Sequence, residues 1–284
     1  MREELLDRTV ELLQKSGFQV FVPLEKRSLF DVLARRGCEL FLIKVLENID
    51  GLKKQQAMNL KNLAGKLGAS CLIIGKKTKE YSLLNGVVYE RYGIYAVNLY
   101  TLEDALSGNL PLKKYWKGKL IVNPKFPNLK SDEIAEILGV SRESVYMYKK
   151  GIMKMDYSKA ARLEKFGLEL GAYDIFAPPC PEKVQINGYL KDLEKLGFDV
   201  VPVYKKFDAL AKEKESLLLK KELKPSRVDV DYLLKTSQLL KSHPVFVSER
   251  KEEAVDGVPV IREEEIKKAR KAKDIIKLVK ERED

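Results

Sequence analysis

Hydrophobic positions follow two spacings along the chain. From Leu5 to Leu13 they recur every three or four residues and Gly17 follows, which predicts a helix over about residues 2–15. Three short runs rich in Val, Leu and Phe come next and predict strands, at residues 18–22, 29–35 and 40–46. A second helical pattern covers about residues 51–67, and the unbroken apolar runs CLII (71–74) and IYAV (94–97) are typical of inner parallel strands. Together these patterns predict an α/β fold around a mixed sheet.

The same order of patterns returns near the C-terminus, which indicates an internal repeat. Four matches lie in the same order in both copies: Gly17-Phe18 with Gly197-Phe198, Pro23 with Pro202, Phe30-Asp31 with Phe207-Asp208, and Leu42-Ile43-Lys44 with Leu218-Leu219-Lys220. Each copy therefore predicts a helix, three strands, a helix, two strands and a helix. The last helix of the second copy is expected to run from about Glu263 to Glu281 as one long, charged element.

A segment of different composition separates the two copies. Pro124 and Pro127 mark its start, and APPCP, residues 177–181, marks its end, so both ends are predicted to be linkers. The expected domains are a nuclease-like α/β domain over residues 1–121, a helical module with its linkers over 122–178, and a second, shorter α/β domain over 179–284.

The charge of the chain narrows the choice of partners. The 284 residues include 53 Lys and Arg against 42 Asp and Glu, a formal net charge of +11, and such a positive field attracts phosphate polyanions. No apolar run of about 18 residues is present, and the N-terminus MREELLDRTVELL lacks the pattern of a signal peptide, so we expect a cytoplasmic protein without membrane contact. Cys38, Cys71 and Cys180 lie far apart, without the spacing of a zinc site or a disulfide framework, and no metal or cofactor is expected.

The stretch SDEIAEILGVSRESVYMYKKG, which begins at Ser131, has the pattern of a helix-turn-helix. One helix is predicted over residues 132–138, Gly139 and Val140 make the turn, and Ser141 caps a second helix. The apolar seam shared by the two helices consists of Ile134, Leu138, Val140, Val145 and Tyr148. A small helical spacer with a solvated basic face remains the alternative interpretation.

This stretch resembles the helix-turn-helix of Cro and repressor-like regulators, in which the start of the second helix contacts base edges in the major groove. The residues that the resemblance assigns to DNA contact are Ser141, Arg142, Glu143, Tyr146, Lys149 and Lys150. The arginine and glutamate would face bases, the tyrosine would lie along the groove, and the two lysines would face phosphates. The full helix that usually precedes the pair is replaced by VNPKFPNLK (122–130), whose two prolines exclude a normal helix.

A second resemblance concerns the first α/β copy. Asp31 begins one predicted strand and Lys44 ends the next, an order similar to that of the restriction-endonuclease-like superfamily, especially archaeal Holliday junction resolvases. In active members the resemblance implies an aspartate followed by acid-x-lysine on the next strand, with the two carboxylates holding Mg²⁺. Here the acid position is Leu42, which cannot ligate a cation. The second copy repeats this defect, so the degenerate nuclease site comprises Asp31, Leu42 and Lys44 with Asp208, Leu218 and Lys220.

Other carboxylates are the alternatives for the missing metal ligand, namely Glu3, Glu4, Glu39 and Glu47. Side chains alternate along a strand, so Glu39 is expected to point away from the face that carries Lys44. The preferred interpretation makes Asp31 a polar residue at a strand end and Lys44 a strand lysine that reaches solvent. Cleavage is therefore not expected.

With the repeat, the helix-turn-helix and the stretch FDVLARRG…LFLIKVLENID in view, nearly the whole chain resembles archaeal helix-turn-helix transcriptional regulators with a nuclease-like domain. The resemblance implies a non-enzymatic regulator that binds duplex DNA, and we expect a homodimer because one short recognition helix contacts only a few base pairs. Two alternatives remain. One is a factor that binds structured RNA or the ribosome, and the other is a residual Mg²⁺-dependent nuclease for branched DNA.

Overall fold

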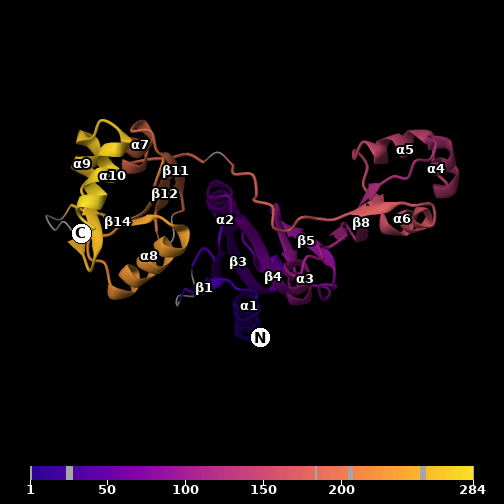
Figure 1. Ribbon diagram of the computed structural model, residues 1–284, viewed down its shortest axis with the longest axis horizontal. Helices are drawn as coiled ribbons and strands as arrows, with labels where there is room; N and C mark the ends of the chain where they lie inside the picture. Colours follow the sequence, from indigo (N-terminus) through magenta and orange to yellow (C-terminus); the bar gives the residue numbers. More distant parts are fainter. Residues whose placement is uncertain (1, 24–27, 183, 204–206, 250–253, 284) are drawn as a thin grey trace. The chain divides into compact units, whose positions relative to one another are not determined.

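The computed structural model describes residues 2–23, 28–182, 184–203, 207–249 and 254–283 (Figure 1). It divides into two compact units, of which unit 1 comprises residues 1–9, 45–52 and 72–177, and unit 2 comprises residues 10–44, 53–71 and 178–284. The boundary between them passes through the first sheet. The division into domains over 1–121, 122–178 and 179–284 stays a prediction.

The first α/β copy follows the predicted order of elements. These elements are α1 (Arg2–Lys15), β1 (Gln19–Phe21), β2 (Val32–Arg36), β3 (Glu39–Asn48), η1 (Ile49–Gly51), α2 (Lys54–Leu67), β4 (Ser70–Lys77), β5 (Val87–Arg91), β6 (Ile94–Val97) and α3 (Leu99–Leu106). The apolar runs form β4 and β6, which pair in parallel, as the sequence predicts. Two elements were missed: the short helix η1, and the strand β5, which forms a tight antiparallel hairpin with β6.

Helix ends in this copy have local causes. Gly17 takes a φ of +82° after α1, and the N–H of Phe18 then donates to the carbonyl of Leu13 at 3.0 Å. Gly68 ends α2 in the same left-handed region, with a φ of +64°. A side chain at these positions would be strained, so glycine lets the chain leave the helix and enter the next strand.

The second copy repeats the first in its fold. Its elements are α7 (Tyr189–Lys195), β11 (Asp199–Pro202), β12 (Ala209–Lys212), β13 (Ser216–Lys221), α8 (Arg227–Leu240), β14 (His243–Val247), β15 (Ala254–Val255), β16 (Val258–Ile261), α9 (Glu263–Lys268) and α10 (Ala272–Glu281). The strand order β11-β12-β13-β14-β16-β15 is the same as β1-β2-β3-β4-β6-β5 in the first copy. The predicted repeat is therefore a repeat of the α/β fold.

The register of the two copies also agrees. The N–H of Asp31 donates to the carbonyl of Ile43, and the N–H of Asp208 donates to the carbonyl of Leu219, each at 2.8 Å. Leu33 faces Leu42 across the first ladder, as Leu210 faces Leu218 across the second; all four side chains are buried. These bonds place the matched residues in equivalent positions.

The expectation of one long helix over residues 263–281 is wrong. The chain leaves the helix at Ala269, which has extended dihedral angles, and α10 begins only at Ala272. The N–H of Ala272 donates to the carbonyl of Leu196 at 2.8 Å. This tertiary hydrogen bond, which local sequence cannot reveal, stabilises the break.

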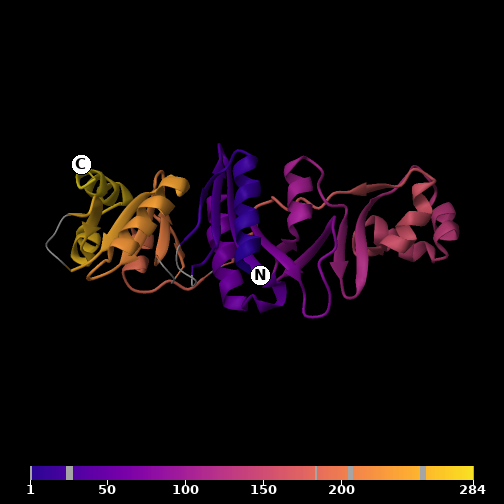
Figure 2. The same cartoon turned by 90° about the horizontal axis from the view of Figure 1, so that it is seen from below.

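Between the copies lie β7 (Lys113–Trp116), β8 (Lys119–Lys125), α4 (Ser131–Leu138), α5 (Arg142–Lys149), β9 (Met155–Asp156), α6 (Tyr157–Glu164) and β10 (Glu169–Gly171). The three helices gather beside the end of β8 (Figures 1 and 2). β8 pairs with β7, β9 and β10 and includes residues 122–125 of the segment before the helices. This segment does not form a helix, as its prolines predict. Within the described residues, no helix combines the length and apolar character needed to cross a membrane.

Candidate nucleic-acid interface

Helices α4 and α5 meet in a sharp turn built as the sequence predicts. Gly139 has a φ of +65°, and the N–H of Val140 donates to the carbonyl of Ala135 at 3.0 Å. Ser141 then caps α5, because its hydroxyl accepts a hydrogen bond from the N–H of Ser144 at 3.2 Å. Side chains of Ile134 and Val145 close the seam without exposed surface. The two helices are thus fixed by a glycine turn, a cap and a buried seam.

A third helix, which the sequence pattern did not assign, completes this module. Ala160 and Leu163 of α6 are fully buried in the same core as the seam residues. Asp156 caps α6 by accepting the N–H of Ser158 at 2.9 Å, and this bond is the main reason that the pKa of the Asp156 carboxyl lies below its usual value. The signal was present in the sequence as Asp-Tyr-Ser before an apolar helical pattern. The helix-turn-helix therefore sits in a folded three-helix module.

The residues expected to contact DNA lie on the open side of α5. Ser141, Arg142, Glu143, Tyr146, Lys149 and Lys150 are all exposed, and Tyr146 is 56% exposed. Val145 and Tyr148 of the same helix are buried. Residues three and four positions apart share a helix face, so Arg142, Tyr146 and Lys149 form one continuous stripe. The structure brings these side chains together on one surface.

Arg142 is not free on this surface. Its Nε contacts the carboxylate of Asp132, at the start of α4, while three quarters of the arginine side chain remains exposed. Lys149 donates to the hydroxyl of Ser131 at 3.3 Å, a weak and exposed bond. Exposed ion pairs contribute little to stability, so a phosphate or base can replace Asp132 at low cost. Sequence analysis assigned no role to Asp132, although the helix dipole favours an acid in the first turn of a helix such as α4.

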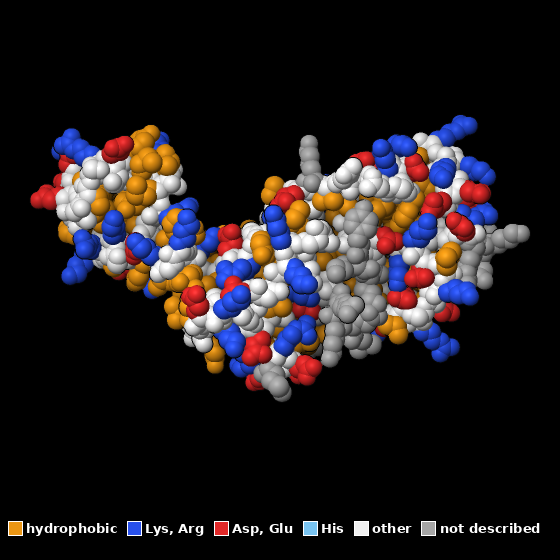
Figure 3. Space-filling model, turned by 180° about the vertical axis from the view of Figure 1, so that it is seen from behind, with side chains coloured by type: hydrophobic (Ala, Val, Ile, Leu, Met, Phe, Trp, Pro, Cys, Tyr) orange, Lys and Arg blue, Asp and Glu red, His pale blue; other side chains and the backbone are white. Residues whose placement is uncertain are grey.

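The surface of the module combines basic and apolar side chains. Figure 3 shows it at the left of the view, where Lys and Arg side chains border a strip of hydrophobic ones. The exposed large hydrophobic residues of the module are Tyr146, Ile152, Met153 and Phe166. An interface with nucleic acid uses both kinds of side chain, because phosphates need cations and sugars and bases offer apolar surface.

The nuclease-like position of the first copy holds a buried ion pair. Lys44 Nζ lies 3.0 Å from Asp31 Oδ1 and 3.1 Å from the carbonyl oxygen of Ser28. The Lys44 side chain is 8% exposed and that of Asp31 is 5% exposed. The expectation that Lys44 reaches solvent is therefore wrong. Leu42, which lies two residues before Lys44 in β3, is fully buried.

The second copy pairs its equivalent lysine differently. Lys220 Nζ lies 2.5 Å from Oδ1 of Asp229 on α8, whereas Asp208 accepts the hydroxyl of Tyr189 at 3.1 Å. Burial raises the pKa of Asp229, but hydrogen bonds from Lys220 and from Ser226 lower it more, to about 2. Asp229 was missed by sequence analysis. Its signal was the pair Ser226 and Asp229, spaced as a capping box at the start of a helix.

These residues do not fit the Mg²⁺ site that the fold implies. Both copies have leucine at the acid position, and Asp31 is held by Lys44. Of the alternative ligands, Glu4 pairs with Lys76 at 3.0 Å and Glu39 with Arg36 at 2.7 Å, while Glu3 and Glu47 are exposed. No three His, Cys, Asp or Glu side chains of the described part of the chain gather closely enough to hold a metal ion. No hydrolytic step follows from this geometry.

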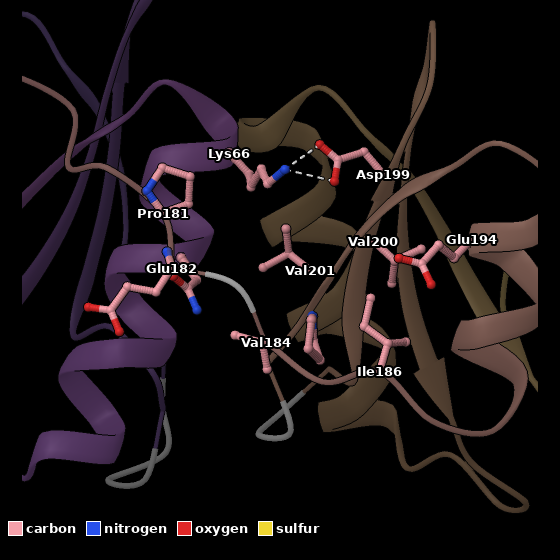
Figure 4. Close-up of a pocket in the computed structure, with 11 residues that line it drawn as sticks. Lys66, Pro181, Glu182, Val184, Ile186, Glu194, Asp199, Val200 and Val201 are labelled. Atoms are coloured by element: carbon pink, nitrogen blue, oxygen red, sulfur yellow. Dashed lines mark hydrogen bonds and ion pairs between the residues drawn. The ribbon is translucent and has the colours of Figure 1, made fainter.

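Unit 2 contains a cavity of about 420 Å³ with an apolar floor (Figure 4). Val184, Ile186 and Val201 line it, and Lys66 of α2 lies 2.5 and 2.7 Å from the two carboxylate oxygens of Asp199. Glu182 and Glu194 also line the cavity. The lysine is already neutralised and the other charges are negative, so this cavity does not suit a phosphate group.

Comparison with known proteins agrees with the nuclease-like α/β fold and with the presence of a helix-turn-helix. The family model of the PD-(D/E)XK superfamily domain matches residues 2–111, which supports the restriction-endonuclease-like fold of the first copy. The fold and the helical module together define a nuclease-like α/β protein that carries a helix-turn-helix. No solved structure matches the chain at a significant level.

Full-length relatives define the family more closely. A protein of Pyrococcus furiosus is 34% identical over 99% of this chain and 98% of its own length, and one of Methanocaldococcus jannaschii is 31% identical over 99% and 97%. A third, from Thermococcus kodakarensis, is 32% identical over 98% and 96%. Each is named "Putative HTH-type transcriptional regulatory protein". The chain belongs to this archaeal family of HTH-type regulatory proteins.

Proposed function

We propose that the protein binds duplex DNA through α5 and acts as a transcriptional regulator that does not cut the nucleic acid. One observation carries the proposal: a capped, well-packed α5 presents Arg142, Tyr146 and Lys149 on one exposed stripe. In a helix-turn-helix the second helix enters the major groove with this face towards the bases. The names of the relatives support the same class of function.

The charge around α5 supports a polyanionic partner. Residues 113–171 include 13 Lys and Arg against 7 Asp and Glu, so this fifth of the chain carries more than half of the net charge of +11. Contacts from lysine to phosphate supply affinity, whereas Arg142 offers the bidentate hydrogen bonds that distinguish guanine. The negative charge of Glu143 would repel a neighbouring phosphate, and its carboxylate would accept a hydrogen bond from the amino group of cytosine.

The lack of cleavage is part of the proposal. It rests on Leu42 and Leu218 at the two acid positions and on the Asp31–Lys44 pair, which satisfies the lysine internally. We also propose a homodimer, because α5 has eight residues and one such helix contacts only a few base pairs. Two copies would read two half-sites separated by about one helical turn of DNA, roughly 34 Å.

Binding to genomic duplex fragments and to ribosomal RNA at near-physiological salt tests this function. We expect tighter binding to duplex DNA, and we expect the double substitution Arg142→Ala with Lys149→Ala to weaken it at least about tenfold and to lower the salt slope by roughly one per lost phosphate contact. Lys273→Ala with Lys277→Ala removes two exposed charges from α10 and is the matched control, expected to leave binding unchanged.

Three results would contradict parts of the proposal. If the α5 double variant binds duplex DNA with the same affinity and salt slope, the assignment of the recognition helix fails. Preference for ribosomal RNA would favour the structured-RNA alternative. Sedimentation of the DNA-bound protein as a single copy would remove the homodimer.

A further inference from the structure

Two hairpin tips of unit 1 lie side by side at one end of the first sheet. β5 and β7 are parallel neighbours, with Val87 opposite Lys113 and Val88 opposite Lys114. Each strand ends in a two-residue turn, β5 before β6 and β7 before β8. The two strands run in the same direction from these paired residues and have nearly equal lengths beyond them. Their turns therefore lie at the same height along the sheet, to within about one residue.

The two turns have the same backbone geometry. Tyr92 and Gly93 take φ values of +52° and +77°, and Lys117 and Gly118 take +46° and +81°. Positive φ at both central residues is the type I′ turn, whose twist matches that of paired strands. A tyrosine and a lysine are unusual in the first of these positions, since a side chain there is strained. Because they are the first central residues of the two turns, Tyr92 and Lys117 lie at the extreme end of the sheet.

Aromatic side chains are exposed at this end. Tyr92 is 50% exposed, and Trp116, which immediately precedes the second turn, is 45% exposed. Trp116 is the only tryptophan of the chain. Large aromatic residues usually bury most of their surface, so two at adjacent tips suggest a surface that is covered when a partner binds.

An aromatic stack lies at the base of the tips, and exposed lysines lie at their ends. Tyr115 stacks on Tyr89 with ring centroids 5.2 Å apart and anchors β7 from the opposite face of the sheet. Lys117 and Lys119 are exposed, and the charge of Lys119 also acts on the carboxylate of Asp156, whose pKa it helps to lower. Lys117 Nζ lies 4.8 Å from the centre of the Trp116 ring, so a cation already accompanies the indole.

We propose that these tips, formed by Tyr92, Trp116, Lys117 and Lys119, bind unpaired nucleotides by stacking bases on the two aromatic rings and pairing phosphates with the two lysines. Single-stranded nucleic acid is recognised by this combination, because every base has a face that stacks and every nucleotide carries a phosphate. The rings are too few for a hydrophobic protein interface, and the lysines would repel a basic partner. The site is separate from α5 and does not depend on the role of that helix.

The single tryptophan makes the proposal directly measurable in the full-length protein. Titration with a short oligothymidine strand should quench the fluorescence of Trp116 to saturation, whereas a blunt duplex of the same length should quench it little. With a labelled strand, Trp116→Ala should weaken single-strand binding by about 5- to 150-fold, the range expected for one base–aromatic stack. Tyr92→Ala should give a smaller loss.

Tyr100→Ala is the matched control, because Tyr100 is 56% exposed but follows the opposite end of β6. It should bind the strand normally, and circular dichroism should show all three variants folded. No quenching by saturating oligothymidine, or equal weakening by Tyr100→Ala, would overturn the proposal. So would an equal loss of duplex binding in Trp116→Ala, which would make the tips part of a duplex interface.

The two proposals fail separately. Arg142→Ala with Lys149→Ala should weaken duplex binding and spare the oligothymidine strand, and Trp116→Ala should do the reverse. If only the α5 double variant behaves otherwise, the assignment of the recognition helix fails and the binding site at the tips stands. If only Trp116→Ala behaves otherwise, the binding site at the tips fails and the recognition helix stands.

Discussion

Lys44 and Asp31 form an ion pair at 3.0 Å with each side chain less than a tenth exposed. In an active enzyme of this fold these two groups would face a metal ion and water. Here they face each other, and the carbonyl of Ser28 takes a further hydrogen bond from the lysine. The pair is a structural element of the first sheet, and this has measurable consequences.

Removing one member of the pair should cost more stability than replacing both. Lys44→Met takes the ammonium group away from the buried Asp31 carboxylate, and we expect a loss of up to about 3–5 kcal/mol in the free energy of unfolding, as when one partner of a buried pair is removed. The double substitution Asp31→Leu with Lys44→Met removes both charges and should recover a large part of that loss. Urea unfolding of the two single variants and the double variant measures this, and additive effects would show that the pair is not coupled.

Mg²⁺ should not promote cleavage by this protein. Incubation with branched and linear DNA over a range of Mg²⁺ and Mn²⁺ concentrations should leave the strands intact, because the acid position is leucine in both copies. Leu42→Glu should not restore cutting, since Lys44 already binds Asp31. Nicking that disappears in Lys44→Ala would reverse the non-enzymatic assignment.

Asp132 should restrain DNA binding through its contact with Arg142. In Asp132→Asn the guanidinium is released and a negative charge next to the DNA is lost, so affinity for duplex DNA should rise about two- to fivefold, the range of an exposed ion pair. Titration by fluorescence anisotropy at fixed salt checks this. Glu164→Gln, at the end of α6, is the comparison for loss of one acid elsewhere in the module.

Acid should weaken the second copy through Asp229. Its pKa of about 2 lies below the usual 3.8, so its stabilising effect is complete above pH 4 and is lost as the pH falls through 2. A shift of this size corresponds to on the order of 2 kcal/mol. Asp229→Asn should therefore destabilise the protein by about that much at pH 7 and by much less near pH 2.

The matched control for this effect lies on the same helix. Asp231→Asn removes a carboxylate that is about half exposed in its pair with Lys235, and it should change the free energy of unfolding by less than about 1 kcal/mol. Equal losses in the two variants at pH 7, or a loss in Asp229→Asn that is independent of pH, would contradict the role of Asp229.

A side chain in the turn of the helix-turn-helix should destabilise the protein. Gly139→Ala places a Cβ in open space but at a φ of +65°, so the cost is strain of the backbone, about 1–2 kcal/mol. Gly51→Ala is the control, because its added Cβ also meets open space and its φ is not in the left-handed region. Thermal unfolding of the two variants should separate them by several degrees.

Local patterns predicted much of this fold. The helix α1 and the parallel strands β4 and β6 follow from the spacing of apolar residues, and the turn at Gly139 follows from a glycine and a cap. The sequence match of Asp31 with Asp208 is confirmed by the structure, because both residues make the equivalent backbone hydrogen bond to the next strand. These features depend on neighbours along the chain, which sequence contains directly.

Other features depend on distant partners and could not be predicted. β5 was not assigned, because the segment around Tyr92 lacks the Asn-Gly or Asp-Gly pair that marks such a turn. The break at Ala269 needs the carbonyl of Leu196. Burial of Lys44 depends on Asp31 across the sheet, and single-residue propensity places lysine in solvent.

Equivalent lysines in the two copies bind acids from different places in the fold: Lys44 binds Asp31, which directly precedes β2, and Lys220 binds Asp229 on α8. In the second copy the position equivalent to Asp31 is occupied by Asp208, which accepts a hydrogen bond from the hydroxyl of Tyr189 instead. Both copies therefore keep this strand lysine paired with a carboxylate, although the carboxylate comes from a different part of the α/β repeat in each copy.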